Sequence, residues 1–431
     1  MKTVIMAGGL GTRIKELFPD IPKPLIKIGD RTILELELLS LKEQGFNEII
    51  LTLSHMADKI IDYFGNGERL GINIDYFVER EPLGNAGALF KIPQLEGDFL
   101  LLNADSLFDI DFNRFVAFHR EHQALVSLLT HPNSHPYDSG LILADDRNCV
   151  TGWLNKEDPR PLYYKNRVNA GLHILNSKVL SLCKVDRDAI GQRREGGTVK
   201  VDLDRDVLKP LCNSGLMFAY DSPEYVKDMG TPECFSQVLS DYTHGLVARK
   251  KLTKKQRAIF LDRDGTINKY VGFLRDLDEF ELLPGVSEAI KIINSLGYLA
   301  IVVTNQPVVA RGEVSIEKLE QIHQKMETLL GKDGAYLDAI YYCPHHKDKG
   351  FEGEIVALKI DCDCRKPKPG MLLKAARDFN IDLEQSWMVG DSMTDIEAGC
   401  AASCHTALVG HENYGQEKTY TSLLEFAQHL T

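Results

Sequence analysis

The stretch AIFLDRDGTIN, residues 258–268, carries two aspartates one residue apart directly after a short apolar run. In an extended chain the side chains of Asp262 and Asp264 point to the same side. Two carboxylates placed in this way can bind Mg²⁺, or act as a nucleophile and an acid or base. A calcium loop of the EF-hand type is the alternative, but the glutamate that ends such a loop is absent here. The stretch therefore indicates a carboxylate site at the end of a strand.

Three further polar residues follow in the same half of the chain, namely Thr304 in VVTNQ, Lys366 in CRKPKPG and Asp391 in MVGDSMTD. Thr304 or Lys366 alone would fit a surface residue, but the ordered set resembles the haloacid dehalogenase superfamily. The resemblance implies that Asp262 attacks phosphorus to form an aspartyl phosphate and that Asp264 acts as the acid and base. It also implies Mg²⁺ held by Asp262, Asp391 and the backbone carbonyl of Asp264. Thr304 and Lys366 would then hold the transferred phosphoryl oxygens.

Four potential metal ligands form the pattern C-x-H…C-x-C, with Cys343, His345, Cys362 and Cys364. Three cysteines and one histidine make up a closed, structural zinc set. Two unrelated pairs of reduced residues are the alternative, and His346 could replace His345 as the ligand. The pattern predicts a zinc site that supports the fold and takes no part in the chemistry.

The stretch from DRDGTIN to CDCRKPKPGML resembles D,D-heptose 1,7-bisphosphate phosphatases and the related histidinol phosphatases. This resemblance favours His345 over His346 and implies that the zinc loop shapes the rim of the site. The short span between the nucleophile and Thr304 leaves no room for a large inserted cap, so we expect a small, open site. Two departures, Pro307-Val308 after TNQ and Ser392 after Asp391, leave the substrate open. The residues that the resemblance places on substrate phosphate are Asn305, Gln306, Arg365 and Lys366, with Arg365 on the phosphate that is not removed.

A second candidate site lies at the amino terminus, in MAGGLGTRIKELFPDIPKPLIKIG. Glycines allow backbone N–H groups to approach phosphate oxygens, and the downstream cations can neutralise a triphosphate. The spacing matches neither the dinucleotide-binding fingerprint nor the Walker loop, and a tight turn is the alternative. The residues concerned are Gly8, Gly9, Gly11, Thr12, Arg13 and Lys23.

This loop and five later motifs, in order, resemble the sugar-1-phosphate nucleotidyltransferase family over roughly the first 240 residues. The later motifs are PLGNAGAL, LNADSLF, VTGWLNK, VNAGLHIL and KDMGTPE. The resemblance implies Mg²⁺ on Asp105 and Asp228, and Arg13 and Lys23 on the phosphates. A turn or helix-capping role is the alternative for Asp105. PLGNAGAL would hold the base and start a helix, and its Asn85 stands where threonine is usual, which leaves the base open. The other residues assigned to nucleotide or sugar phosphate are Gly84, Lys156 and Asn169, with Lys156 facing the sugar phosphate.

Composition excludes several classes of protein. The 431 residues carry a formal net charge of -12, which argues against a nucleic-acid partner but not against phosphorylated substrates. No apolar run is long enough for a bilayer, and the first residues predict a buried strand rather than a signal peptide. Nine cysteines without regular spacing argue against a disulfide framework, so we expect a cytoplasmic location. The sequence leaves homo-oligomerisation open.

The pattern of apolar residues predicts α/β structure in two doubly wound domains. Each alternates short apolar runs with helix-like stretches, which predicts a mostly parallel sheet covered on both faces. Residues 1–243 would form a Rossmann-like nucleotidyltransferase sheet, and residues 258–431 a haloacid dehalogenase-like Rossmannoid sheet with the zinc loop. The basic segment 244–257 is interpreted as a linker or solvated helix, with a basic binding patch as the weaker alternative.

Together the two resemblances predict a bifunctional enzyme that uses sugar phosphates and an NTP. It would remove the C7 phosphate of D-glycero-D-manno-heptose 1,7-bisphosphate and then use GTP to form GDP-D-glycero-α-D-manno-heptose, a precursor for lipopolysaccharide or S-layer glycans. Mg²⁺ would serve both sites. The base and the anomer rest on resemblance alone. One alternative is a transferase for another hexose 1-phosphate, such as mannose or glucose, and another is that one half is a regulatory binding module.

Overall fold

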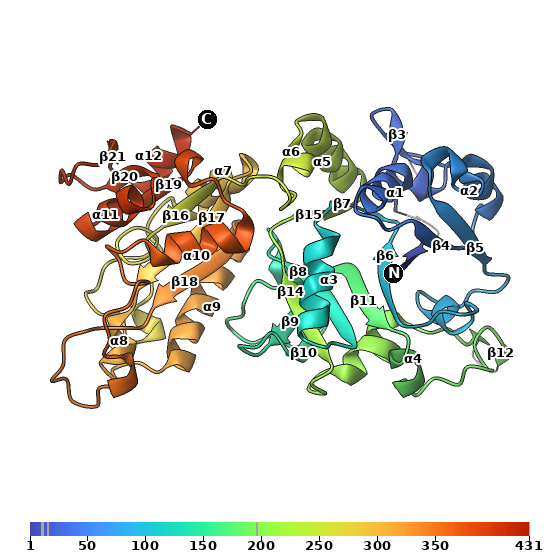
Figure 1. Ribbon diagram of the computed structural model, residues 1–431, viewed down its shortest axis with the longest axis horizontal. Helices are drawn as coiled ribbons and strands as arrows, with labels where there is room; N and C mark the ends of the chain where they lie inside the picture. Colours follow the sequence, from blue (N-terminus) through green and yellow to red (C-terminus); the bar gives the residue numbers. More distant parts are fainter. Residues whose placement is uncertain (10–12, 15–16, 195–196, 431) are drawn as a thin grey trace. The chain divides into compact units, whose positions relative to one another are not determined.

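The computed structural model describes residues 1–9, 13–14, 17–194 and 197–430 (Figure 1). The chain divides into two compact units. The first comprises Met1–Thr130, Ile142–Trp153 and Asn169–Lys251, and the second comprises His131–Leu141, Leu154–Val168 and Leu252–Thr431. The second unit thus includes two segments that lie within the predicted transferase range. In the described part of the chain, no helix is both long enough and apolar enough to span a membrane.

The first unit is built on a nine-stranded sheet with the order β10-β9-β11-β6-β1-β4-β5, extended by β8 and β14. β6, β1, β4 and β5 are parallel, whereas β11 is antiparallel to β6. The main strands are β1 (Lys2–Met6), β4 (Glu48–Leu53), β5 (Asn73–Val78), β6 (Asp98–Asn103), β8 (Val126–His131), β9 (Leu141–Ala144), β10 (Val150–Leu154), β11 (Val168–Asn176) and β14 (Met217–Asp221). The helices are α1 (Ile33–Glu43), α2 (Ala57–Phe64), α3 (Phe112–Glu121), α4 (Val179–Leu182), α5 (Pro232–Thr243) and α6 (Leu246–Arg249).

Successive residues of these strands enter two different cores. In β1, Val4 lies in one buried cluster and Ile5 in the other, and Ile50 and Leu51 of β4 divide in the same way. Successive side chains of a strand point to opposite faces. Both faces of the sheet are therefore covered, as the apolar runs predicted.

The second unit contains a six-stranded parallel sheet with the order β18-β17-β16-β19-β20-β21. Ile259 and Leu261 of β16 lie in one core, and Ala258 and Phe260 lie in the other. The strands are β16 (Ala258–Leu261), β17 (Leu299–Asn305), β18 (Ala339–Cys343), β19 (Trp387–Gly390), β20 (His405–Val409) and β21 (Lys418–Tyr420). The helices are α7 (Val286–Ser295), α8 (Pro307–Ala310), α9 (Ile316–Lys332), α10 (Gly370–Phe379), α11 (Met393–Ala401) and α12 (Leu423–Gln428).

The segment Leu154–Val168 of this unit is hydrogen-bonded to α9. The backbone N–H of Tyr164 donates to Thr328 Oγ1 at 2.9 Å, and the Thr328 hydroxyl donates to the Tyr164 carbonyl at 3.1 Å. Both residues are buried. A buried hydroxyl therefore satisfies both polar groups of one residue, which stabilises this segment on the helix.

The basic segment is packed, which differs from the solvated linker expected from its charge. α6 places Val247 in a buried cluster, and Lys251 is buried with its Nζ 2.8 Å from Asp109 Oδ1. Farther along, the backbone N–H of Gln256 donates to the carbonyl of Asn380 at 3.0 Å. The aliphatic part of a lysine side chain can be buried when its ammonium group pairs with a carboxylate. The number of charges in a segment does not show whether such a partner exists elsewhere in the fold.

Candidate active sites

The carboxyl ends of the parallel strands of the second unit surround a cavity of about 330 Å³. Asp262 and Asp264 follow β16, Thr304 lies at the end of β17, and Asp391 follows β19. Ligands of open α/β sheets bind at this edge. All the residues predicted for the phosphatase chemistry and its phosphate contacts line the cavity: Asp262, Asp264, Thr304, Asn305, Gln306, Arg365, Lys366 and Asp391.

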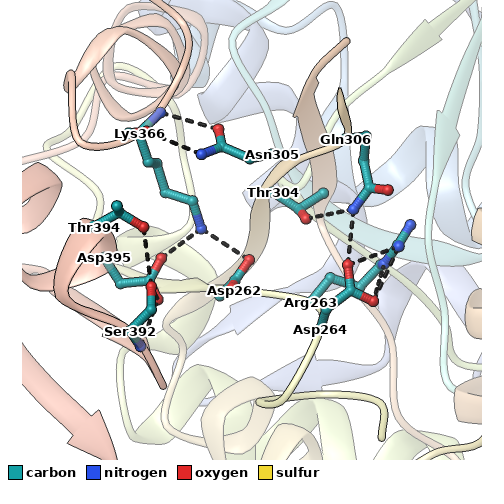
Figure 2. Close-up of polar contacts among 10 residues, drawn as sticks. All are labelled: Asp262, Arg263, Asp264, Thr304, Asn305, Gln306, Lys366, Ser392, Thr394 and Asp395. Atoms are coloured by element: carbon teal, nitrogen blue, oxygen red, sulfur yellow. Dashed lines mark hydrogen bonds and ion pairs between the residues drawn. The ribbon is translucent and has the colours of Figure 1, made fainter. Parts of the chain in front are cut away.

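A buried ammonium links two carboxylates at the base of this site (Figure 2). Lys366 Nζ lies 2.8 Å from Asp262 Oδ1 and 2.6 Å from Asp395 Oδ1. Burial raises the pKa of Asp262 to about 7, with Asp395 adding to the rise and Lys366 opposing it. Burial opposes the charge of Lys366, but the two carboxylates raise the pKa of this lysine above its ordinary value. Lys366 is therefore a fixed positive charge beside the predicted nucleophile.

The carboxylates of Asp262, Asp391 and Asp395 fit a hard cation. Their ligand oxygens lie within 4.8 Å of one another. Burial and the charge of Asp395 raise the pKa of Asp391 to about 6, so the site favours a neutralising positive charge. Mg²⁺ prefers carboxylate oxygens, and the donor set matches it.

The side chain of Asp264 is held by a separate set of donors, of which Figure 2 shows Arg263 and Gln306. Arg263, which is fully buried, donates from Nη2 to both carboxylate oxygens at 3.0 and 2.8 Å. Gln306 Nε2 donates to Oδ2 at 2.9 Å, and Asn268 Nδ2 donates to Oδ1 at 3.0 Å. The predicted acid and base is therefore oriented independently of Lys366.

The carboxyl ends of β1, β4, β5 and β6 border a second cavity, of about 560 Å³, in the first unit. Its lining combines the glycine-rich loop with cations, a carboxylate and the PLGNAGAL segment. Of the predicted residues, it includes Gly8, Gly9, Arg13, Lys23, Gly84, Asn85 and Asp105. Gly11 and Thr12 lie outside the described residues.

Lys23 lies between the two aspartates predicted to hold Mg²⁺. Its Nζ is 3.6 Å from Asp105 Oδ2 and 3.5 Å from Asp228 Oδ1. The pairing of β7 (Ser106–Asp109) with β15 (Tyr225–Asp228) aligns Asp228 with Ser106, next to Asp105. Both carboxylates are about half exposed, so they can accept a hydrated cation.

The four predicted zinc ligands converge. Cys364 Sγ lies 3.2 Å from the sulfur atoms of both Cys343 and Cys362, and 3.2 Å from His345 Nδ1. A zinc ion about 2.3 Å from each sulfur fits such a cluster. His346 instead lies with Nε2 3.5 Å from Arg311, so the structure brings His345 and not His346 to the cysteines.

Comparison with known proteins assigns each half of the chain to a protein family. The nucleotidyl transferase family model matches residues 2–245, and a HAD-hydrolase-like model matches residues 363–428. The D-glycero-beta-D-manno-heptose-1,7-bisphosphate 7-phosphatase of Pasteurella multocida is 46% identical over 155 residues, which cover 36% of this chain and 82% of that protein. The corresponding Haemophilus influenzae protein is 45% identical over 146 residues, covering 34% and 77%. The chain belongs to the nucleotidyl transferase family and to the family of these phosphatases. It is a bifunctional enzyme.

Among solved structures, the chain is similar to HddC from Yersinia pseudotuberculosis. The identity is 26%, the match covers 56% of this chain and 99% of that chain, and the TM-score is 0.46.

Among the described residues, three that were predicted for the nucleotidyl transferase half do not line its cavity, namely Lys156, Asn169 and Asp228. Lys156 is exposed and lies on the 154–168 segment of the other compact unit. Asn169 Oδ1 lies 3.2 Å from His173 Nε2 and accepts from the Gly171 N–H at 3.3 Å. The order of motifs along the sequence does not reveal which compact unit a segment joins.

The phosphatase half uses some predicted phosphate ligands to position others. Asn305 Nδ2 donates to the Lys366 carbonyl, and the Lys366 N–H donates to Asn305 Oδ1, both at 3.0 Å. Gln306 Nε2 donates to Thr304 Oγ1 at 2.9 Å in addition to Asp264. Arg365 Nη1 donates to the His345 carbonyl at 3.2 Å, which connects the zinc loop to the cavity.

Both departures from the phosphatase pattern lie at helix starts. Pro307 is the first residue of α8, where its missing N–H removes no helical hydrogen bond. Ser392 caps α11, and its Oγ donates to Asp395 Oδ2 at 2.6 Å. Ser392 thereby orients the carboxylate that contacts Lys366.

Asp395 is a site residue that the sequence analysis missed. It lies in the first turn of α11 and is completely buried, and a Cβ atom at position 390 would lie 2.3 Å from its Cγ. Gly390 therefore leaves the space that this carboxylate occupies. The available signal was a second aspartate four residues after Asp391, in the stretch that begins α11.

Proposed function

We propose that the enzyme removes the C7 phosphate from D-glycero-D-manno-heptose 1,7-bisphosphate and then joins the resulting heptose 1-phosphate to GMP from GTP. The products are inorganic phosphate, GDP-heptose and pyrophosphate. The observation that carries the proposal is the Asp262–Lys366–Asp395 cluster, in a chain that over 155 residues is 46% identical to a heptose bisphosphate phosphatase and that also contains a nucleotidyl transferase half.

In the phosphatase half, Asp262 Oδ would attack the C7 phosphorus while the P–O bond to the sugar breaks. Asp264 would give a proton to the departing sugar oxygen and then take one from the water that cleaves the aspartyl phosphate. Lys366 and Thr304 would hold the phosphoryl oxygens, because both line the cavity beside Asp262. Mg²⁺ on Asp262, Asp391 and the Asp264 carbonyl, with Asp395 nearby, would supply the charge that lets one anion attack another.

In the transferase half, an oxygen of heptose 1-phosphate would attack the α-phosphorus of GTP, and pyrophosphate would leave. Arg13 and Lys23 would neutralise the charge that gathers on the phosphates. Lys23 contacts both predicted Mg²⁺ ligands, Asp105 and Asp228, so cation binding would release its ammonium toward the triphosphate. Zn²⁺ on the C-x-H…C-x-C cluster would hold the rim of the phosphatase site.

The anomer is part of the proposal. The resemblance of the transferase half favours the α anomer, whereas the phosphatases of P. multocida and H. influenzae are named for the β anomer. Because both halves must accept the same sugar for the product of one to feed the other, one anomer should be turned over by both activities.

The test is incubation of the purified enzyme with each anomer of the bisphosphate and Mg²⁺, together with GTP, ATP, UTP or CTP. We expect phosphate release with every nucleotide and pyrophosphate release with GTP. Mannose 1-phosphate and glucose 1-phosphate serve as competing acceptors. Absence of pyrophosphate with GTP would remove the guanylyl assignment, and faster turnover of a hexose 1-phosphate would remove the heptose assignment.

A further inference from the structure

An arginine, Arg263, lies between the two aspartates that begin the phosphatase site. Asp262 and Asp264 line the cavity, whereas the side chain of Arg263 is completely buried. Burying a guanidinium costs free energy unless its charge is paired and its N–H groups are hydrogen-bonded. The partners of Arg263 therefore show which groups its charge stabilises.

The first partner of the guanidinium is the carboxylate of Asp264 (Figure 2). Arg263 Nη2 donates to Oδ1 at 3.0 Å and to Oδ2 at 2.8 Å. Oδ1 also accepts from Asn268 Nδ2 at 3.0 Å, and Asn268 is completely buried. Oδ2 accepts from Gln306 Nε2 at 2.9 Å, and Gln306 lines the cavity. Oδ1 is thus anchored by two buried side chains, and Oδ2 is the oxygen beside a residue of the cavity wall.

The second partner of the guanidinium is a histidine of α9. Arg263 Nη1 lies 3.4 Å from Nε2 of His323, a residue that is 2% exposed. A guanidinium has only donors, so Nε2 accepts and the ring proton must lie on Nδ1. Burial, and next the charge of Arg263, lowers the pKa of His323 well below its ordinary value, which agrees with a neutral ring. His323 therefore holds the guanidinium as a buried acceptor.

The backbone of the loop is fixed at the same arginine. The N–H groups of Ile267 and Asn268 donate to the Arg263 carbonyl at 2.8 and 3.0 Å. This turn requires a φ of 89° at Gly265, a conformation that glycine adopts without strain. The backbone of Arg263 is thus held by its own loop, and the end of its side chain is held by His323.

We propose that His323 and Arg263 are positioning residues of the phosphatase, through which α9 holds Asp264 so that its Oδ2 delivers a proton to the departing sugar oxygen. The inference rests on the proposed phosphatase reaction and adds two residues behind its acid and base. Neither residue would touch the substrate. His323 acts on the guanidinium, and the guanidinium acts on the carboxylate.

The arrangement supports proton transfer more than nucleophilic attack. When Asp262 Oδ bonds to phosphorus, the P–O bond to the sugar breaks and its electron pair stays on the sugar oxygen. That oxygen takes the proton from Asp264, and a carboxylate charge develops within hydrogen-bond distance of the buried guanidinium, which stabilises it. A proton on Oδ2 replaces one of its two hydrogen bonds, and Gln306 Nε2 keeps Thr304 Oγ1 as an acceptor at 2.9 Å.

The test separates proton transfer from attack by changing the leaving group. Single-turnover rates are measured with Mg²⁺ and enzyme in excess, for heptose 1,7-bisphosphate and for p-nitrophenyl phosphate. A sugar alkoxide is strongly basic and needs a proton as it leaves, whereas nitrophenolate is weakly basic and leaves without one. His323→Leu removes the acceptor, so the rate with the bisphosphate should fall at least about 10-fold and the rate with p-nitrophenyl phosphate less than about 2-fold.

Two amides at the same position provide the matched comparison. His323→Gln places a carbonyl oxygen where it can accept from Arg263 Nη1 and should restore most of the bisphosphate rate, whereas His323→Asn is one carbon shorter and should not. Gln321→Leu changes an exposed residue of the same helix and should leave both rates unchanged. Because the ratio of the two rates is compared, a smaller fraction of folded enzyme lowers both rates equally and does not affect the result.

An unchanged ratio in a folded His323→Leu variant, or equal ratios in the Gln and Asn variants, would overturn the inference and leave the phosphatase reaction intact. If the unmodified enzyme released no phosphate from heptose 1,7-bisphosphate, the proposed substrate would be wrong instead. The same ratio would then be measured with a sugar phosphate that the enzyme does hydrolyse, and a selective loss in His323→Leu would still support the inference.

Discussion

Asp395 gives the sharpest prediction for a single residue. Its carboxylate is buried 2.6 Å from Lys366 Nζ, so Asp395→Asn removes one of the two charges that hold a buried ammonium. We expect the phosphatase kcat to fall about 100-fold, because Lys366 would lose its position beside the phosphoryl group. The free energy of unfolding, measured with urea, should fall by about 3 kcal/mol.

Glu288→Gln is the control for this substitution. It breaks an exposed pair, with Glu288 Oε2 2.9 Å from Lys291 Nζ, and should change stability by less than about 1 kcal/mol and leave both activities intact. A folded Asp395→Asn variant with unchanged kcat would show that Asp262 alone positions Lys366.

At this scale the sequence predicted the residues that lie in short motifs at strand ends. Asp262, Thr304 and Asp391 come together because parallel strands end at one edge of a sheet, and that rule needs no three-dimensional information. Asp395 could not be found in this way. Its contact with Lys366 depends on how the first turn of α11 returns over the strand ends, which is a long-range feature.

At the scale of elements, local periodicity predicted most helices and strands well. α7, Val286–Ser295, and α10, Gly370–Phe379, bury apolar residues at three- and four-residue spacing, which is the helical pattern that the sequence shows. Which strands pair, and in which direction, is harder to predict from the sequence. β11 lies antiparallel beside β6, and no local pattern of residues indicates this. The prediction of a solvated linker for the basic segment 244–257 failed for a related reason. The burial of Lys251 depends on Asp109, which lies in a strand far away in the sequence.

The zinc loop gives a prediction at this scale. Protein purified without added metal should contain about one zinc ion per chain, and Cys362→Ser should lose it because three ligands hold zinc less tightly than four. Phosphatase activity should fall, because the Arg365 contact with the His345 carbonyl connects this loop to the cavity. The melting temperature of the phosphatase unit should drop by at least about 5 °C.

Cys400→Ser is the control for the zinc prediction, since Cys400 is exposed and lies outside the cluster. It should retain zinc and activity. Metal analysis that found no zinc in the unmodified protein, together with full stability, would leave the cluster as three reduced thiols and a histidine without a metal.

At the scale of the whole molecule, each compact unit assembles its own cavity from its own strand ends. A phosphatase matched over 82% of its length by 155 residues of this chain performs its reaction without a transferase half of this size. A single substitution in one cavity should therefore remove one activity and leave the other. Asp262→Asn should abolish phosphate release yet form pyrophosphate from added heptose 1-phosphate and GTP. Asp105→Asn should release phosphate and form no pyrophosphate.

Mixing the two variants tests whether the intermediate leaves the enzyme. With bisphosphate and GTP, neither variant alone should make GDP-heptose, and an equimolar mixture should make it after a lag while heptose 1-phosphate accumulates in solution. The lag should shorten as enzyme concentration rises, because the intermediate must diffuse from one molecule to another. If the mixture stays inactive although each variant turns over its own substrate, heptose 1-phosphate passes between the two sites of one chain. If Asp262→Asn releases phosphate at the normal rate, Asp262 is not the nucleophile.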